Sequence, residues 1–161
     1  MPGAGAVTVA VGEPGGRGAS WPLLLQLFAT SAMTGLIWFV QMVHYPLFRA
    51  VGTSEFVAYE AAHVRLTTFV VGPLMLLESA TALWLVTARP DFATPAQAWI
   101  GLGLLGVIWA STALLSVPLH DALQLGFDAS THAALVATNW IRTVAWTARC
   151  GLLLVLLRAA R

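Results

Sequence analysis

The sequence predicts an all-α protein, a transmembrane up-down-up-down four-helix bundle. Of its 161 residues, 58% are hydrophobic and only 9% are charged, whereas soluble domains carry about 25% charged residues. The apolar residues come in four long runs separated by short polar segments. Such a chain has too few charges for a surface that faces water, so a membrane protein is expected.

The charge balance and the cysteine count exclude several other classes. The net charge is +1 and all eight basic residues are arginine, so no basic patch points to a nucleic-acid partner. The single Cys150 excludes an intrachain disulfide and any CxxC motif. The expected partner is the lipid bilayer, and an oligomer is possible.

We expect two regions along the chain. Residues 1–19 are rich in Gly, Ala and Pro and show no apolar periodicity, so they are predicted to form a disordered tail. Residues 20–161 are predicted to form the four-helix transmembrane domain, since each apolar run reaches the ~20 residues that a spanning helix needs.

The first predicted helix runs from about Trp21 to Tyr45, with Ser20 as its N-cap. Pro46 is expected to break or bend it. The second begins after Thr53 or Ser54 and reaches about Ala88, with a kink at Gly72-Pro73.

The third predicted helix opens at Thr94-Pro95 and runs to about Val117, and Pro118 should bend its last turns. The fourth begins near Asp128 or Ser130 and continues to about Leu157. Asp128 is favoured as a helix N-cap over a role as a ligand.

Arginine placement predicts the orientation. Both termini should lie in the cytoplasm of a bacterial cell, with the protein in the inner membrane, because cytoplasmic ends of spans carry more arginine. The side of the termini holds four of the eight arginines and the opposite side holds two, Arg49 and Arg65.

All four histidines are expected near one face of the membrane, the extracytoplasmic face in this orientation. His44 and His120 end the first and third helices, whereas His63 and His132 begin the second and fourth. Since successive helices alternate in direction, these positions come to a similar depth. The histidines could share a metal or cofactor, line a polar pocket without metal, or be unrelated interfacial residues.

Glu60 and His63 form a Glu-x-x-His pair on one helical face, an arrangement that can offer a carboxylate and an imidazole to one metal. A second copy, which di-iron bundles need, is absent from the sequence. The histidines His44, His63, His120 and His132 would suit Fe, Cu, Zn or a haem, with Glu60 as a further ligand or a proton acceptor.

A deeper polar layer is predicted from Glu78, Arg142 and Arg149. Glu78 and Arg149 lie at similar depth on parallel helices, and Arg142 lies nearer mid-membrane. Charges inside a membrane are costly, so Glu78 should form an ion pair with Arg149 or Arg142. The pairing could be functional or purely structural.

Residues 38–48 (WFVQMVHYPLF) and 139–143 (NWIRT) resemble small uncharacterised bacterial four-span membrane proteins. In size and layout the chain is similar to anthrone-oxygenase-like membrane proteins. No catalytic motif matches residue by residue, so the resemblance implies the architecture and no function.

Three functions follow as hypotheses. The first is a membrane oxidoreductase with a histidine-held metal or haem, acting on a lipophilic substrate from the outer leaflet, with Glu60, Glu78, Arg142 and Arg149 as catalytic-site residues. The second is a proton- or anion-coupled transporter or binding protein. The third is a structural subunit of a membrane complex.

Overall fold

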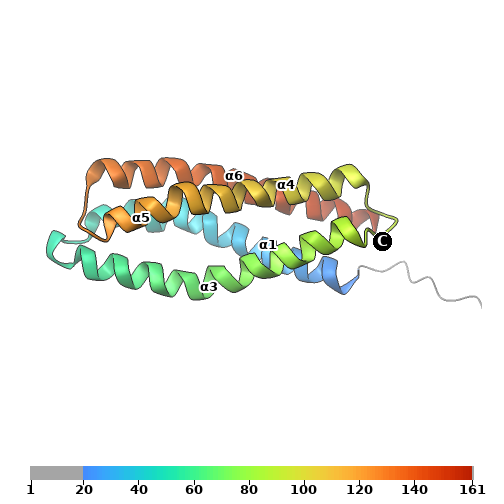
Figure 1. The fold of residues 1–161 in the computed structure, drawn as a ribbon, viewed down its shortest axis with the longest axis horizontal. Coiled ribbons are helices and arrows are strands. Elements are labelled where there is room, and N and C mark those ends of the chain that lie inside the picture. Colours follow the sequence, from blue (N-terminus) through green and yellow to red (C-terminus); the bar gives the residue numbers. More distant parts are fainter. Residues whose placement is uncertain (1–19, 161) are drawn as a thin grey trace, which may run out of the picture.

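Our computed structural model describes residues 20–160, and every regular element in that range is helical. Four long rods lie side by side and alternate in direction (Figure 1). The predicted up-down-up-down bundle is therefore confirmed. The rods comprise α1 (Trp21–Phe39), η1 (Val40–His44), α2 (Tyr45–Leu47) and η2 (Phe48–Ala50); α3 (Thr53–Thr87); α4 (Pro95–Ser111), η3 (Thr112–Ser116) and α5 (Val117–Leu123); and α6 (Ala129–Ala159).

The first and third rods continue past the prolines that were expected to break or bend them. Each contains a five-residue π-helical segment, Val40–His44 or Thr112–Ser116, followed two residues later by Pro46 or Pro118. A proline has no N–H to donate and its ring presses on the carbonyl four residues earlier. The wider π turn accommodates this conflict without ending the helix, and such turns are frequent at functional sites.

Of the two predicted N-caps, Asp128 makes a capping hydrogen bond and Ser20 does not, and the third rod begins at Thr94-Pro95 as predicted. The Thr94 hydroxyl accepts a hydrogen bond from the backbone N–H of Gln97, and the side-chain oxygen of Gln97 accepts one from the backbone N–H of Thr94, which makes a capping box. Asp128 caps α6 by accepting from the backbone N–H of Thr131 at 2.7 Å. Ser20 occupies the N-cap position of α1, but its hydroxyl makes no capping hydrogen bond.

The bundle is apolar on its outside as well as in its core. Phe69 and Leu114 are each 73% exposed although they lie in the middle parts of their rods, while Glu60 and Glu78 are fully buried. This inverted distribution fits a surface that contacts lipid. All four rods, Trp21–Ala50, Thr53–Thr87, Pro95–Leu123 and Ala129–Ala159, are long and apolar enough to cross a membrane.

The chain is therefore a multi-pass membrane protein. Both helix ends nearest the termini, Trp21 and Ala159, lie at one end of the bundle, and the loops after Ala50 and Leu123 lie at the other (Figure 1). We call the latter the histidine end. The predicted tail, residues 1–19, lies outside the part of the chain that the structure describes.

Candidate functional site

Three of the four histidines meet at the histidine end. His44 comes from η1, His63 from α3 and His120 from α5. Nε2 of His44 and Nδ1 of His63 share a hydrogen bond of 2.9 Å, and the ring centroids of His63 and His120 are 5.2 Å apart. The alternating helix direction thus brings together residues that are up to 76 positions apart in the chain (120 − 44).

His132 lies beside this group with a separate contact. Its Nε2 donates to the backbone carbonyl of Tyr45 at 2.7 Å, and its ring stacks near that of Phe48. The N–H of Nε2 is therefore occupied by a hydrogen bond that links α6 to α2.

A hydrogen-bonded chain runs from Glu60 through His120 to Tyr45. The Glu60 carboxylate contacts Nδ1 of His120, and Nε2 of His120 lies 2.9 Å from the Tyr45 hydroxyl. A carboxylate only accepts hydrogen bonds, so Nδ1 carries the proton in this contact. In the neutral imidazole, Nε2 is then the acceptor for the Tyr45 O–H.

Arg142 joins this chain from α6. Its Nη2 donates to the Tyr45 hydroxyl at 3.2 Å and to Oδ1 of Asn139 at 2.5 Å. Asn139 in turn donates to Gln41 at 2.9 Å, and Gln41 donates to the backbone carbonyl of Val136. Arg142 is thus held by the Asn139 amide and the Tyr45 phenol, and Gln41 in turn holds Asn139.

A cavity of about 320 Å³ lies against this polar group in the interior of the bundle. Its polar end is formed by Tyr45, His63, His120 and Arg142, and its other walls are mainly apolar. The remaining lining residues come from all four rods: Met33, Leu36, Ile37, Val40, Val64, Thr67, Thr68, Val71, Gly72, Met75, Trp109, Thr112, Ser116, Val117, Asp121 and Trp146.

The cavity is closed on one side and open on the other. Met33 on α1 and Trp146 on α6 are each 1% exposed, whereas Thr68 on α3 and Val117 on α5 reach the outer surface. Asp121 is an exposed carboxylate on the same side. The opening therefore lies between α3 and the η3–α5 part of the third rod, where the bundle would face lipid.

The predicted deeper layer is present, with Arg149 as the partner of Glu78. Arg149 Nε lies 3.5 Å from Oε1 of Glu78, which also accepts from Thr30 at 2.5 Å. Oε2 of Glu78 accepts from Trp146 at 2.9 Å. Since Trp146 also lines the cavity, its indole separates the cavity from the ion pair.

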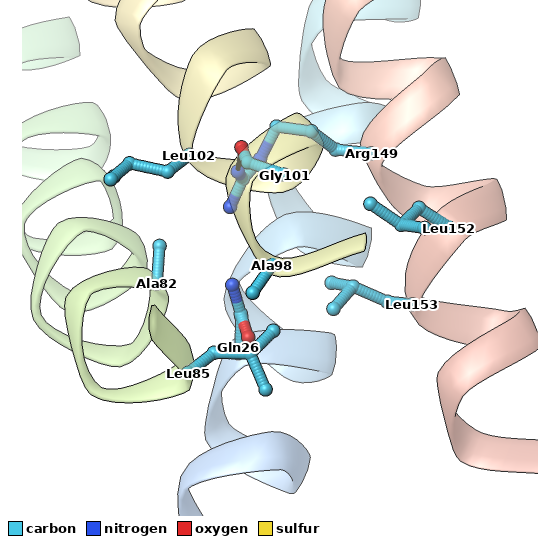
Figure 2. A pocket seen from close by; sticks show the side chains of 9 residues that line it. All are labelled: Gln26, Ala82, Leu85, Ala98, Gly101, Leu102, Arg149, Leu152 and Leu153. Carbon is cyan, nitrogen blue, oxygen red and sulfur yellow. Dashed lines mark hydrogen bonds between the residues drawn. The ribbon is translucent and has the colours of Figure 1, made fainter. Parts of the chain in front are cut away.

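Below the ion pair, Arg149 donates to the backbone carbonyl of Gly101. Figure 2 shows Arg149 from α6 and Gln26 from α1 pointing toward one small pocket. Nη2 of Arg149 and Oε1 of Gln26 have no hydrogen-bond partner among residues 20–160. The pocket has a volume of only about 10 Å³, close to the space of one water molecule.

The predicted metal site gains no support from this geometry. Within residues 20–160, no group of three or more His, Cys, Asp or Glu side chains is arranged to hold a metal ion. Glu60 and His63 do share a buried face, but Glu60 contacts His120 and His63 contacts His44. The oxidoreductase hypothesis therefore stays a prediction, which elemental analysis and an absorption spectrum of the purified protein would test.

The sequence analysis missed two features of the site. Tyr45 was predicted only as the end of the first helix, yet it contacts His120 and Arg142 through its hydroxyl and His132 through its carbonyl. The cavity itself was not foreseen. Pro46, directly after Tyr45, was the available signal for the π-helical segment Val40–His44 that precedes Tyr45.

Comparisons with models of known protein families, with curated proteins and with solved structures found no match. The function proposed below accordingly rests on the geometry of the site.

Proposed function

We propose that the protein binds a lipophilic molecule with an acidic head group, such as a medium-chain carboxylic acid, in the cavity between its four helices. This is a form of the binding-protein or carrier hypothesis. The observation that carries the proposal is the state of Arg142, a buried arginine that lines the cavity and forms no ion pair with a carboxylate of residues 20–160.

An unpaired charge inside a membrane protein is expensive and marks a substrate or ion pathway more often than a structural contact. Arg142 is 8% exposed, and its hydrogen-bond acceptors, Tyr45 and Asn139, are both neutral. Arg149 shows the contrasting case, because its charge is matched by Glu78. A carboxylate in the cavity would give Arg142 the same compensation.

Other features of the cavity support a lipophilic ligand. Its volume of about 320 Å³ falls within the usual size of small-molecule sites, which combine apolar walls with a few polar groups. Met33, Ile37, Met75 and Trp146 offer an apolar surface for a hydrocarbon chain. The opening toward lipid would admit a ligand that is already dissolved in the bilayer.

The test is equilibrium binding of radiolabelled decanoate to the purified protein in lipid nanodiscs, with empty nanodiscs as the background for partitioning into lipid. We expect saturable binding that unlabelled decanoate displaces and that decyltrimethylammonium, which has the opposite charge, does not. Decan-1-ol should compete only weakly, because it lacks the charge that Arg142 would bind.

Arg142→Gln should lower decanoate affinity about tenfold or more, because a charged hydrogen bond is lost. Arg65→Gln is the matched control, since Arg65 is an exposed arginine near His63 on α3 and does not line the cavity. Equal affinity of Arg142→Gln and the unaltered protein, or equal competition by the ammonium compound, would contradict the proposal.

A further inference from the structure

The hydrogen bonds around Tyr45 all point in one direction. Arg142 donates to the Tyr45 hydroxyl, the hydroxyl donates to Nε2 of His120, and Nδ1 of His120 donates to Glu60. Glu60 is fully buried, and its other oxygen has no partner within residues 20–160. The order carboxylate, imidazole, hydroxyl is the arrangement by which a positioned base activates a nucleophile.

We propose that Tyr45 is a reactive hydroxyl and that the cavity is an acyl-transfer site for lipophilic esters. The idea rests on the proposed function, because the acid that Arg142 would bind is the product that such a reaction releases. Tyr45 lines the cavity, so its hydroxyl can reach a molecule held there.

The chemical step balances within these residues. The Tyr45 oxygen attacks the ester carbonyl while its proton passes to Nε2 of His120, and Glu60 compensates the imidazolium that forms. The alcohol then leaves and takes this proton, so that an acyl group remains on Tyr45. Water cleaves the acyl group, which restores the phenol and releases the carboxylic acid.

Burial opposes a free phenolate at Tyr45, because a charge loses hydration inside the bundle. The hydrogen-bonded chain Tyr45–His120–Glu60, which we call the relay, avoids this cost, because the phenolic proton leaves only as the new bond forms. The resulting positive charge on His120 lies beside Glu60, and Arg142 lies beside the reacting oxygen. Other ionisable groups near the relay are His63 and His44, on the side of α3 and η1, and Asp121 at the exposed rim.

The chain supplies its own control for a reactivity test. It contains only two tyrosines, Tyr45 and Tyr59, and no lysine. Tyr59 is half-buried on α3, and the structure gives its hydroxyl no hydrogen bond within residues 20–160. The rate at which a reagent modifies Tyr45, divided by its rate at Tyr59, therefore measures the effect of the relay within one molecule.

The experiment uses dodecane-1-sulfonyl fluoride on the full chain in nanodiscs, with the two sites quantified by peptide mass spectrometry. In this reaction the tyrosine oxygen bonds to sulfur, fluoride leaves, and the phenolic proton passes to the base. We expect Tyr45 to be modified about a hundredfold faster than Tyr59, the scale of general-base assistance.

Three further measurements test the roles of His120, the cavity and Tyr45. His120→Gln keeps a hydrogen-bonding side chain but removes the base, so Tyr45 modification should fall to the Tyr59 rate. Excess decanoate should protect Tyr45 and leave Tyr59 unchanged. The unaltered protein should also release p-nitrophenol from p-nitrophenyl decanoate, and Tyr45→Phe should not.

Equal modification of Tyr45 and Tyr59 in the unaltered protein would overturn this inference without any need for a variant. If decanoate binding is intact in that case, the proposed function survives and only the acyl-transfer step fails. If decanoate neither binds nor protects, the proposed function fails as well. Reaction of Tyr45 that is unaffected by His120→Gln would also overturn the role given to the relay.

Discussion

Trp146 donates its indole N–H to Glu78 across 2.9 Å, and the same indole forms part of the cavity wall. This contact places the Glu78–Arg149 pair directly behind the cavity, out of reach of a ligand. Arg149 and Arg142, both on α6, therefore have different environments: the charge of Arg149 is compensated by Glu78, whereas Arg142 has only neutral partners and lines the cavity.

Glu78→Gln should destabilise the bundle by about 3 kcal/mol or more, because removing one partner of a buried pair leaves the other charge uncompensated. Thr30→Val removes only one neutral donor to the same carboxylate and should cost about 2 kcal/mol, the scale of a hydrogen bond to a charged group. Equilibrium unfolding in mixed micelles measures both. The double variant Glu78→Gln/Arg149→Met should recover much of the loss, and a double variant as unstable as Glu78→Gln alone would refute the structural role of the pair.

Asp128 should make stability depend on acidity at the start of α6. Hydrogen bonds from Ser130 and Thr131 lower the pKa of this exposed carboxyl from 3.8 to about 2. A carboxyl with a lowered pKa in the folded state contributes stability that is fully present above about pH 4 and is lost as the pH falls toward 2.

The thermal unfolding midpoint of the unaltered protein should therefore fall more steeply between pH 4 and pH 2 than that of Asp128→Asn. Asp121→Asn is the control, since Asp121 is an exposed carboxyl nearby that caps no helix. Identical slopes for the unaltered protein and Asp128→Asn would show that the capping contact contributes nothing.

Thr68→Trp should narrow the lateral opening, because Thr68 lines the cavity and is exposed on α3. We expect decanoate to associate more slowly with this variant, while the unfolding midpoint stays close to that of the unaltered protein. Leu66→Trp, on the same helix but outside the cavity lining, should leave association unchanged. Stopped-flow measurement in nanodiscs distinguishes the two, and slowing by both variants alike would argue against this entry route.

The orientation predicted from the arginines can be tested at Leu125, which is 89% exposed in the connection between α5 and α6. A Leu125→Cys variant, made with Cys150→Ser, should react with a membrane-impermeant maleimide added to intact cells. A cysteine placed at Asp91, in the connection between α3 and α4, should react only after the cells are opened. The reverse pattern would place the termini outside.

The four spans could be predicted because an apolar run of this length has few other stable structures, whatever the details of its neighbours. The depth of the histidines followed from helix direction alone, and so did the similar depth of Glu78 and Arg149, although the sequence left Arg142 open as the partner of Glu78. These features depend on the length of the apolar runs and on the alternating direction of successive helices, and both can be read from the sequence.

The choice of partners within each layer could not be predicted in the same way. Glu60 and His63 share a helical face, yet each meets a residue of another rod: Glu60 contacts His120 and His63 contacts His44. The π-helical turns before Pro46 and Pro118 shift the facing direction of later residues. The partners that Tyr45 meets on other rods therefore could not be predicted from apolar periodicity.

The most direct test of the central claim is photo-crosslinking with a decanoate analogue that carries a diazirine at the end of its chain. If the carboxylate binds Arg142 and the chain lies in the cavity, peptide mass spectrometry should find adducts on cavity residues such as Met33, Met75 and Trp146, and Arg142→Gln should abolish them. Adducts confined to lipid-facing residues such as Phe69 and Leu114, unchanged by Arg142→Gln, would contradict the account.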